Sequence, residues 1–146
     1  MTEVQFHVKV GDRLGYTCRL LRKALRKGTK VAVTGAPGLL AELDRALWTF
    51  DAGEFLPHLR LAAGAAPSAQ HRHTPLWLVD DARGAEHLPV LVNLANLDHE
   101  PPRGFESFER LFEVVSDDAA ELAAGRRRWK HYAGRGYAVA MHEAVG

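Results

Sequence analysis

A short run of β-branched residues between two glycines constrains the fold of this chain more than any other feature. Residues 30–34 read Lys-Val-Ala-Val-Thr, with Gly28 before them and Gly35 after them. A brief apolar run without alternation is typical of a strand buried on both faces, as in a parallel sheet. Parallel strands are joined by crossover connections, usually helices, so the neighbouring segments should be helical.

The segments on either side of this run have the expected periods. Residues 4–10 alternate apolar and polar side chains, which predicts a strand with one buried face. Residues 14–27 and 39–47 repeat apolar side chains at helical spacing. The order strand, helix, strand, helix predicts an α/β domain with a mostly parallel sheet flanked by helices.

The second half of the chain continues this pattern after a polar, alanine-rich loop at residues 62–74. We expect one Rossmann-like domain over residues 1–146, without internal repeats. The further expected elements are strands at 76–79, 89–94 and 111–115, a helical turn at 105–108, a helix from about 119 to 135, and an edge strand at 137–141.

Composition narrows the classes of function. A chain of 146 residues can bury a core without covalent links. The single cysteine, Cys18, excludes an internal disulfide and suits a reducing cytoplasm. No apolar stretch has the length of a membrane span, and residues 1–7 do not begin a signal peptide. The net charge of +1 provides no overall attraction to nucleic acid or membranes. The sequence predicts a cytoplasmic protein with no membrane partner.

The position of a phosphate-binding loop is occupied by residues 34–38, Thr-Gly-Ala-Pro-Gly, between a strand and a helix. The loop lacks the lysine and hydroxyl residue that hold phosphates and a metal ion, and Pro37 removes one N–H donor. The acidic pairs Asp80-Asp81 and Asp117-Asp118 have structural explanations at a turn and a helix start. We therefore expect no catalytic residue, no metal and no cofactor.

Aromatic side chains gather where the second helical pattern ends. Trp48, Phe50 and Phe55 fall within eight residues, and Leu56-Pro57-His58 follows, through which a helix cannot continue. These rings could close off the core, where large apolar side chains are usually found. They could also anchor another protein, since Trp and Phe are enriched at interfaces.

The last predicted helix carries a second unusual segment, residues 125–132, which read Gly-Arg-Arg-Arg-Trp-Lys-His-Tyr. Arg126, Trp129 and Lys130 stand at i, i+3 and i+4, so two cations flank an aromatic ring on one helix face. That arrangement suits an acidic peptide that ends in a hydrophobic residue, or a stacked nucleotide with its phosphate. It also suits a solvated basic face near the end of a helix.

Motifs spread over nearly the whole chain carry a family resemblance. They are Cys18-Arg19-Leu20, Gly28-x-Lys30-Val31, Leu43-Asp44-x-x-Leu47-Trp48-x-Phe50, Phe55-Leu56-Pro57-His58, Val92-Asn93-Leu94, Phe105-x-x-Phe108-Glu109-Arg110 and Arg128-Trp129-x-x-Tyr132-x-x-x-Gly136-Tyr137. In order and spacing these segments resemble the chi subunit of bacterial DNA polymerase III, a small accessory protein of the clamp-loader assembly.

This resemblance implies a single α/β domain that acts as an adaptor without catalysis. Chi proteins bind the psi subunit of the clamp loader on one surface, and in some bacteria they pair with an XPD/Rad3-like helicase. Carried over to this chain, the psi or helicase surface comprises Trp48 and Phe55, with Leu56, Pro57 and His58 shaping the same segment. Within this stretch we expect Leu47 and Phe50 to pack inward.

The resemblance also implies a second partner, the acidic C-terminal tail of single-stranded-DNA-binding protein, which ends in phenylalanine. DNA would then be contacted only indirectly. The corresponding site residues are Val115, Arg126, Trp129 and Lys130, with Arg128 either joining them or facing solvent.

This chain departs from some members of the family at two positions near the tail site. Leu122 stands where some carry a basic residue, and Trp129 stands where others carry tyrosine. The alternative function is direct binding of single-stranded nucleic acid by the basic and aromatic C-terminal helix.

Overall fold

A computed structural model describes residues 1–50, 53, 55–95 and 97–144. Within these residues, seven strands form one sheet in the order β3-β4-β2-β5-β6-β1-β7, and every neighbouring pair is parallel. The strands are β1 (Glu3–Val10), β2 (Val31–Gly35), β3 (His58–Leu61), β4 (Leu76–Val79), β5 (Val90–Leu94), β6 (Arg110–Ser116) and β7 (Val139–Glu143). The prediction of an α/β domain with a mostly parallel sheet is confirmed.

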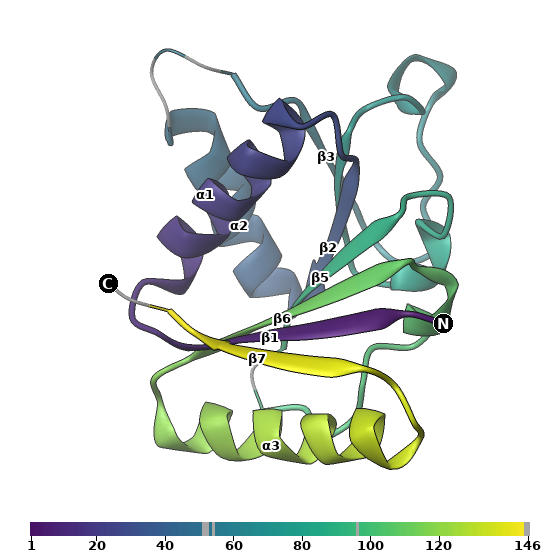
Figure 1. The fold of residues 1–146 in the computed structure, drawn as a ribbon. Helices are drawn as coiled ribbons and strands as arrows, with labels where there is room; N and C mark the ends of the chain where they lie inside the picture. The colour runs from purple at the N-terminus through teal and green to yellow at the C-terminus, as the bar shows by residue number, and fades with distance from the viewer. Residues whose placement is uncertain (51–52, 54, 96, 145–146) are drawn as a thin grey trace.

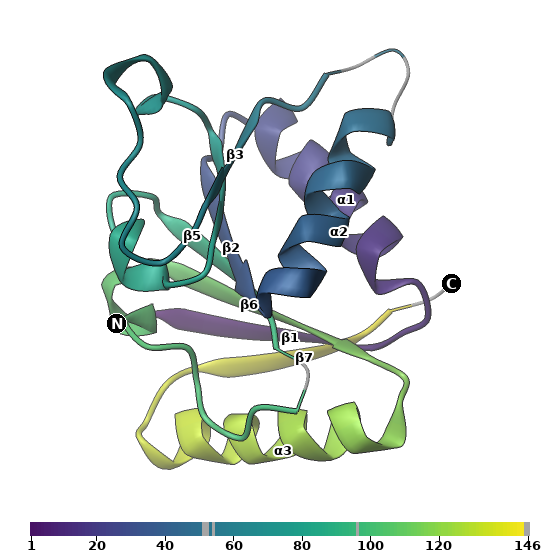
Figure 2. The same ribbon diagram turned by 180° about the vertical axis from the view of Figure 1, so that it is seen from behind.

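Helices cover both faces of this sheet. Helices α1 (Arg13–Arg26) and α2 (Pro37–Thr49) lie together on one face, and α3 (Ala119–Gly134) lies alone on the other (Figure 1). The view from behind shows the same layers, with the segment that follows β5 running beside α3 (Figure 2). Short 3-10 helices occur at Ala69–His71, Ala82–Gly84 and Phe105–Ser107.

The core has two parts because each face of the sheet packs against its own helices. On the α3 side, Phe6, Leu111 and Tyr132 are buried together. On the side of α1 and α2, Leu21 and Leu43 pack against the strands. Strands β2, β4 and β5 lie inside the sheet and are buried along almost their whole length, as an unalternating apolar run predicts.

Most predicted elements are present with shifts of one or two residues at their ends. Asp118 caps α3 by accepting a hydrogen bond from the Glu121 N–H at 3.1 Å, as expected for an acidic residue at a helix start. One strand was missed, namely the edge strand β3, whose four residues are all half-buried. Its sequence, His-Leu-Arg-Leu, is too short and mixed to stand out from a loop.

Among the described residues, no helix combines the length and the apolar character needed to cross a bilayer.

Candidate functional site

The first exposed apolar feature lies at the C-terminal end of α2. Trp48 is 60% exposed and Phe55 is 59% exposed, and their ring centroids are 5.3 Å apart. We refer to these two side chains as the aromatic patch. Two large rings that contact one another while remaining open to water form a ready anchor for an apolar partner surface.

His58 supports this patch from below. Its ring centroid lies 4.9 Å from that of Trp48 and 6.5 Å from that of Phe55. Nδ1 lies 2.7 Å from the carbonyl oxygen of Leu56, and Nε2 lies 2.8 Å from Oδ1 of Asp44. Both neighbours are hydrogen-bond acceptors. Asp44 on α2 therefore fixes the ring on which Trp48 and Phe55 rest.

The remaining residues of this segment divide between core and surface. Leu47 is 2% exposed, and Phe50 packs against the core with the Arg22 guanidinium 4.9 Å from its ring centroid. Both pack inward, as predicted. Leu56 is also buried, so it shapes the aromatic patch from beneath, while Pro57 is exposed beside it.

The second feature is the outer surface of α3, where Arg126, Trp129 and Lys130 are all exposed. We refer to these three residues as the α3 face. Trp129 is 38% exposed, less than either ring of the aromatic patch, and helical spacing places a cation on each side of it. This surface combines a partly open indole ring with two positive charges.

Two residues predicted for this site, Val115 and Arg128, are buried. Val115 is 1% exposed and lies under the helix, where a Cβ added at Gly125 would come within 3.3 Å of it. Arg128 is fully buried and neither joins the α3 face nor meets solvent. The site therefore retains only Arg126, Trp129 and Lys130 at its surface.

Arg128 belongs to a buried polar network between α3 and β6. Its Nε donates to both carboxylate oxygens of Glu113 at 3.1 Å, and Nη1 donates to the carbonyl oxygen of Asp98 at 2.6 Å. Asn93 and Tyr132 donate to the same carboxylate at 3.1 and 2.7 Å. Burial and the nearby Glu113 charge raise the pKa of Tyr132, so this hydroxyl stays protonated. The network clamps α3 to the sheet.

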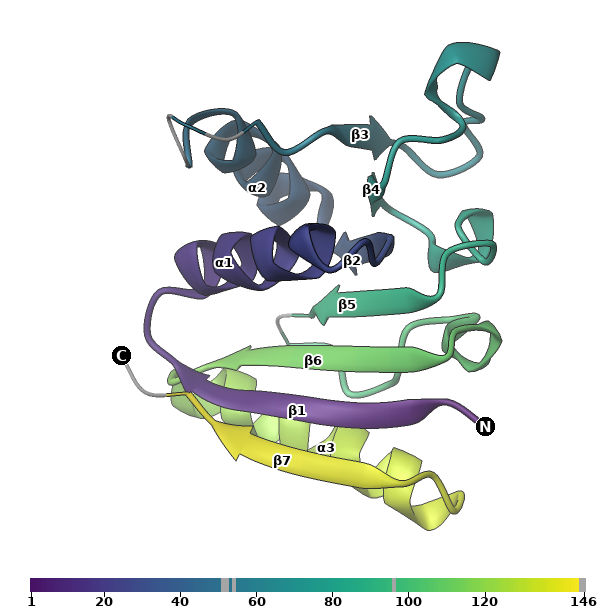
Figure 3. The same cartoon turned by 45° about the horizontal axis from the view of Figure 1, so that its top comes forward.

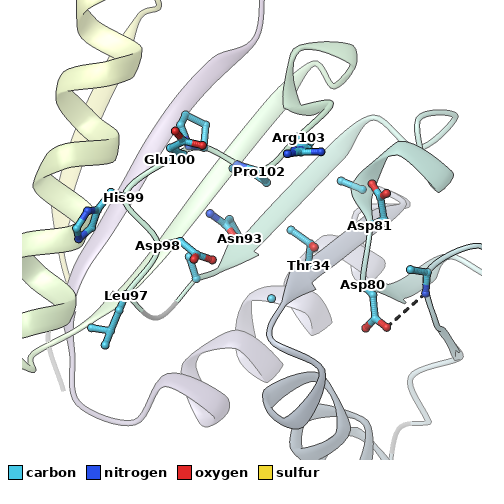
Figure 4. Close-up of a pocket in the computed structure, with 15 residues that line it drawn as sticks. Thr34, Asp80, Asp81, Asn93, Leu97, Asp98, His99, Glu100, Pro102 and Arg103 are labelled. Atoms are coloured by element: carbon cyan, nitrogen blue, oxygen red, sulfur yellow. Dashed lines mark hydrogen bonds between the residues drawn. The ribbon is translucent and has the colours of Figure 1, made fainter.

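A hollow of about 760 Å³ lies at the carboxyl ends of β2, β4 and β5, where open α/β sheets usually bind ligands. Figure 4 shows Thr34 and Asn93 in this hollow, with Asp80, Asp81 and Asp98 around them. Carboxylates repel phosphate groups, although Asp80 pairs with Arg60 and Asp81 with Arg83. This chemistry does not fit a nucleotide.

The described residues provide neither a reactive thiol nor a cluster of metal ligands. Burial raises the pKa of the Cys18 thiol to about 11, so it remains an unreactive thiol in the core. Across residues 1–50, 53, 55–95 and 97–144, no three His, Cys, Asp or Glu side chains gather as a metal site would require.

The buried polar network was not predicted, although the spacing of Arg128 and Glu113 along the sequence indicates that both side chains face the core. Arg128 stands four residues after Ala124 and four before Tyr132, both buried, so it falls on the inner stripe of α3. Glu113 shares a strand face with Leu111 and Val115, where a carboxylate needs a partner. No such signal marks the contact between Asp44 and His58, because it depends on the path of the chain between α2 and β3.

These observations define a class of protein: an open parallel α/β domain whose described surface features are an aromatic patch and a basic helix face. The family described as DNA polymerase III chi subunit, HolC, matches residues 1–140. A DNA polymerase III subunit chi from Pseudomonas aeruginosa is 30% identical over 147 residues, covering 97% of this chain and 96% of that protein. The chain belongs to the chi subunit family of DNA polymerase III, an accessory component in DNA replication.

One further relative and one solved structure are similar to this chain. The DNA polymerase III subunit chi of Haemophilus influenzae is 30% identical over 133 residues, covering 88% of this chain and 85% of that protein. The C-terminal part of the Fun30 ATPase domain superimposes with a TM-score of 0.58 at 13% identity, covering 79% of this chain and 44% of that one. The second likeness concerns the fold alone.

Proposed function

We propose that this protein is an adaptor without a catalytic site of its own, which joins the clamp loader to single-stranded-DNA-binding protein. The observation that carries this proposal is the presence of two exposed features of different chemistry on separate elements. The aromatic patch lies at the end of α2, and the α3 face lies on the opposite side of the sheet (Figure 1). Separate surfaces allow two partners to bind at once.

The aromatic patch is proposed to bind the psi subunit, or an XPD/Rad3-like helicase where psi is not bound. Trp48 and Phe55 are more than half exposed and rest on His58. A preorganised pair of rings loses little side-chain entropy on association, which favours a stable apolar interface. Pro57 adds a rigid exposed neighbour.

The α3 face is proposed to bind the acidic tail of single-stranded-DNA-binding protein. The Trp129 ring can pack against the terminal phenylalanine, while Arg126 and Lys130 pair with its carboxylate and the neighbouring aspartates. Val115 and Arg128 act from beneath by holding α3 against β6. Burial of Arg128 also removes one cation from the alternative, in which this helix binds nucleic acid directly.

Capture from a cell lysate tests the first half of this proposal. Tagged wild-type protein should retain a psi-like subunit or a helicase, identified by mass spectrometry, and Phe55→Ala should lose it. Lys9→Ala, at an exposed residue on β1, serves as the matched control and should retain the same partner. Retention of the partner by Phe55→Ala would contradict the assignment of the aromatic patch.

A further inference from the structure

The net charge of +1 hides an uneven distribution of charge along the chain. Residues 13–30 contain seven cations and no acidic residue, whereas the rest of the chain has 12 lysines and arginines against all 18 acidic residues. The seven are Arg13, Arg19, Arg22, Lys23, Arg26, Lys27 and Lys30. Six of the seven, all but Lys30, belong to α1 or its C-terminal cap Lys27, so one helix is strongly basic within an otherwise acidic chain.

This basic helix borders a part of the sheet whose face toward α1 and α2 is covered by no described helix (Figure 3). In Figure 3, α1 and α2 lie over the side of the sheet formed by β2 and its neighbours, while β1 and β7 are open to the viewer. A groove of about 310 Å³ lies between α1 and this open part. We call it the open-face groove; its lining includes Lys23 and Lys27 on one side and His7, Arg110, Phe112 and His142 on the other.

The open-face groove is positively charged. Lys23, Lys27 and Arg110 line it, and no carboxylate does. Within the described part of the chain, Lys23 and Lys27 have no ion-pair partner. Arg110 reaches only an exposed carboxylate, with its Nε 3.9 Å from Glu3 Oε2. These cations are therefore available to an anionic ligand.

Flat rings lie beside these cations. Phe112 is half-buried and His142 is exposed, and the His7 ring packs between them with centroid distances of 5.6 and 5.4 Å. The Tyr16 hydroxyl bonds to Nδ1 of His7, and Nε2 lies 3.3 Å from Oε1 of Gln5. Burial, together with His142, lowers the pKa of His7 to about 4, so the central ring is neutral near pH 7.

We propose that the open-face groove binds a segment of single-stranded nucleic acid, with phosphates along Lys23, Lys27 and Arg110 and a base against Phe112 or His142. A cationic track beside ring faces is the usual means of holding unpaired strands without sequence preference. Lys23 and Lys27 stand four residues apart, about 6 Å along the helix axis, and Arg110 lines the other side of the groove, a spacing that suits a short run of phosphates.

An acidic peptide fits this groove less well than nucleic acid. The ring faces of Phe112, His7 and His142 lie beside the cations and suit a stacked base, whereas an acidic peptide would leave these faces unused. A cation on each side of one partly open ring occurs instead on the α3 face, with Trp129 between Arg126 and Lys130. The open-face groove shares no residue with the α3 face, so either assignment can fail without the other.

A titration of fluorescent oligothymidylate of about 16 nucleotides with the isolated protein tests this inference. Three phosphate contacts predict that log K falls with log salt at a slope of about −2. Lys23→Glu combined with Lys27→Glu should weaken binding by at least about tenfold, since two contacts become repulsive. Arg126→Glu combined with Lys130→Glu is the matched control and should change affinity less than about twofold.

A milder pair, Lys23→Gln with Lys27→Gln, keeps the test valid if charge reversal disturbs α1, whose last turns carry these residues. His142→Ala should weaken binding by about threefold or more through lost stacking, with an unchanged salt slope. Absence of salt-dependent binding to wild type, or equal losses in the control pair, would overturn the inference. So would tighter, Lys23- and Lys27-dependent binding of polyglutamate, because the groove would then be a site for acidic polypeptide.

Discussion

The aromatic patch and the α3 face use the same kind of side chain in opposite ways. Trp48 and Phe55 contact one another and the His58 ring, and each is close to 60% exposed. Trp129 is 38% exposed and stands between two cations. The two rings of the first surface gain free energy by leaving water, whereas the second surface can also pair with negative charge.

This difference predicts different solution behaviour for the two proposed interfaces. Binding at the aromatic patch should depend weakly on salt because apolar burial is not screened. Binding at the α3 face should weaken as salt rises, since exposed ion pairs lose strength when the screening length falls to about 8 Å. The support beneath each surface also differs: an Asp44–His58 contact lies below one, and a buried ion pair lies below the other.

The largest expected effect concerns Arg128, which is buried on the inner side of α3 and forms no part of the α3 face. Arg128→Ala leaves the Glu113 carboxylate buried without its cation and should lower the free energy of unfolding by about 3–5 kcal/mol. Arg126→Ala, two residues earlier and exposed, should change it by less than about 0.5 kcal/mol. Urea unfolding followed by circular dichroism measures both values. Equal stabilities would show that Arg128 is not a buried clamp.

The next effect compares two neighbours at the end of α2. Leu47→Ala empties a core position and should cost about 2–5 kcal/mol of unfolding free energy. Trp48→Ala should leave stability within about 0.5 kcal/mol, because its ring is mostly in water. The same urea measurement applies. A large loss of stability in Trp48→Ala would mean that the ring serves the core and not a partner.

A smaller effect concerns pH, because the free energy of unfolding should depend on the protonation of His7, which belongs to neither the aromatic patch nor the α3 face. The folded state lowers the pKa of His7 from 6.5 to about 4, so on acidification the unfolded chain binds its proton first. Stability should therefore be complete above about 6.5 and should fall as the pH drops toward 4. We expect a loss of about 1 kcal/mol at pH 5. His7→Gln should remove most of this dependence in urea titrations at several pH values.

Periodicity alone predicted most of the fold, because strand and helix patterns depend on local sequence. The apolar run at β2 and the alternation in β1 both occur as expected. Strand β3 was not predictable, since pairing of His58–Leu61 with β4 depends on long-range geometry. The surface positions of Trp48 and Phe55 matched expectation.

Prediction failed where neighbouring residues of one type face different ways. Within the run of arginines at 126–128, the phase of α3 decides which side chain is buried, and packing of Ala124 and Tyr132 sets that phase. Val115 was predicted to line the tail site together with the last helix, but it is buried beneath Gly125 of that helix. Both corrections follow from tertiary packing, which a local pattern does not contain.

The most direct test of two separate partner surfaces is a titration of the acidic, phenylalanine-ended tail peptide against wild type, Arg126→Ala and Phe55→Ala. Wild type should bind in the micromolar range, roughly −7 to −8 kcal/mol, with affinity that falls as salt rises. Arg126→Ala should lose about tenfold, while Phe55→Ala should bind like wild type. Absence of binding to wild type, or a loss in Phe55→Ala as large as in Arg126→Ala, would contradict the account.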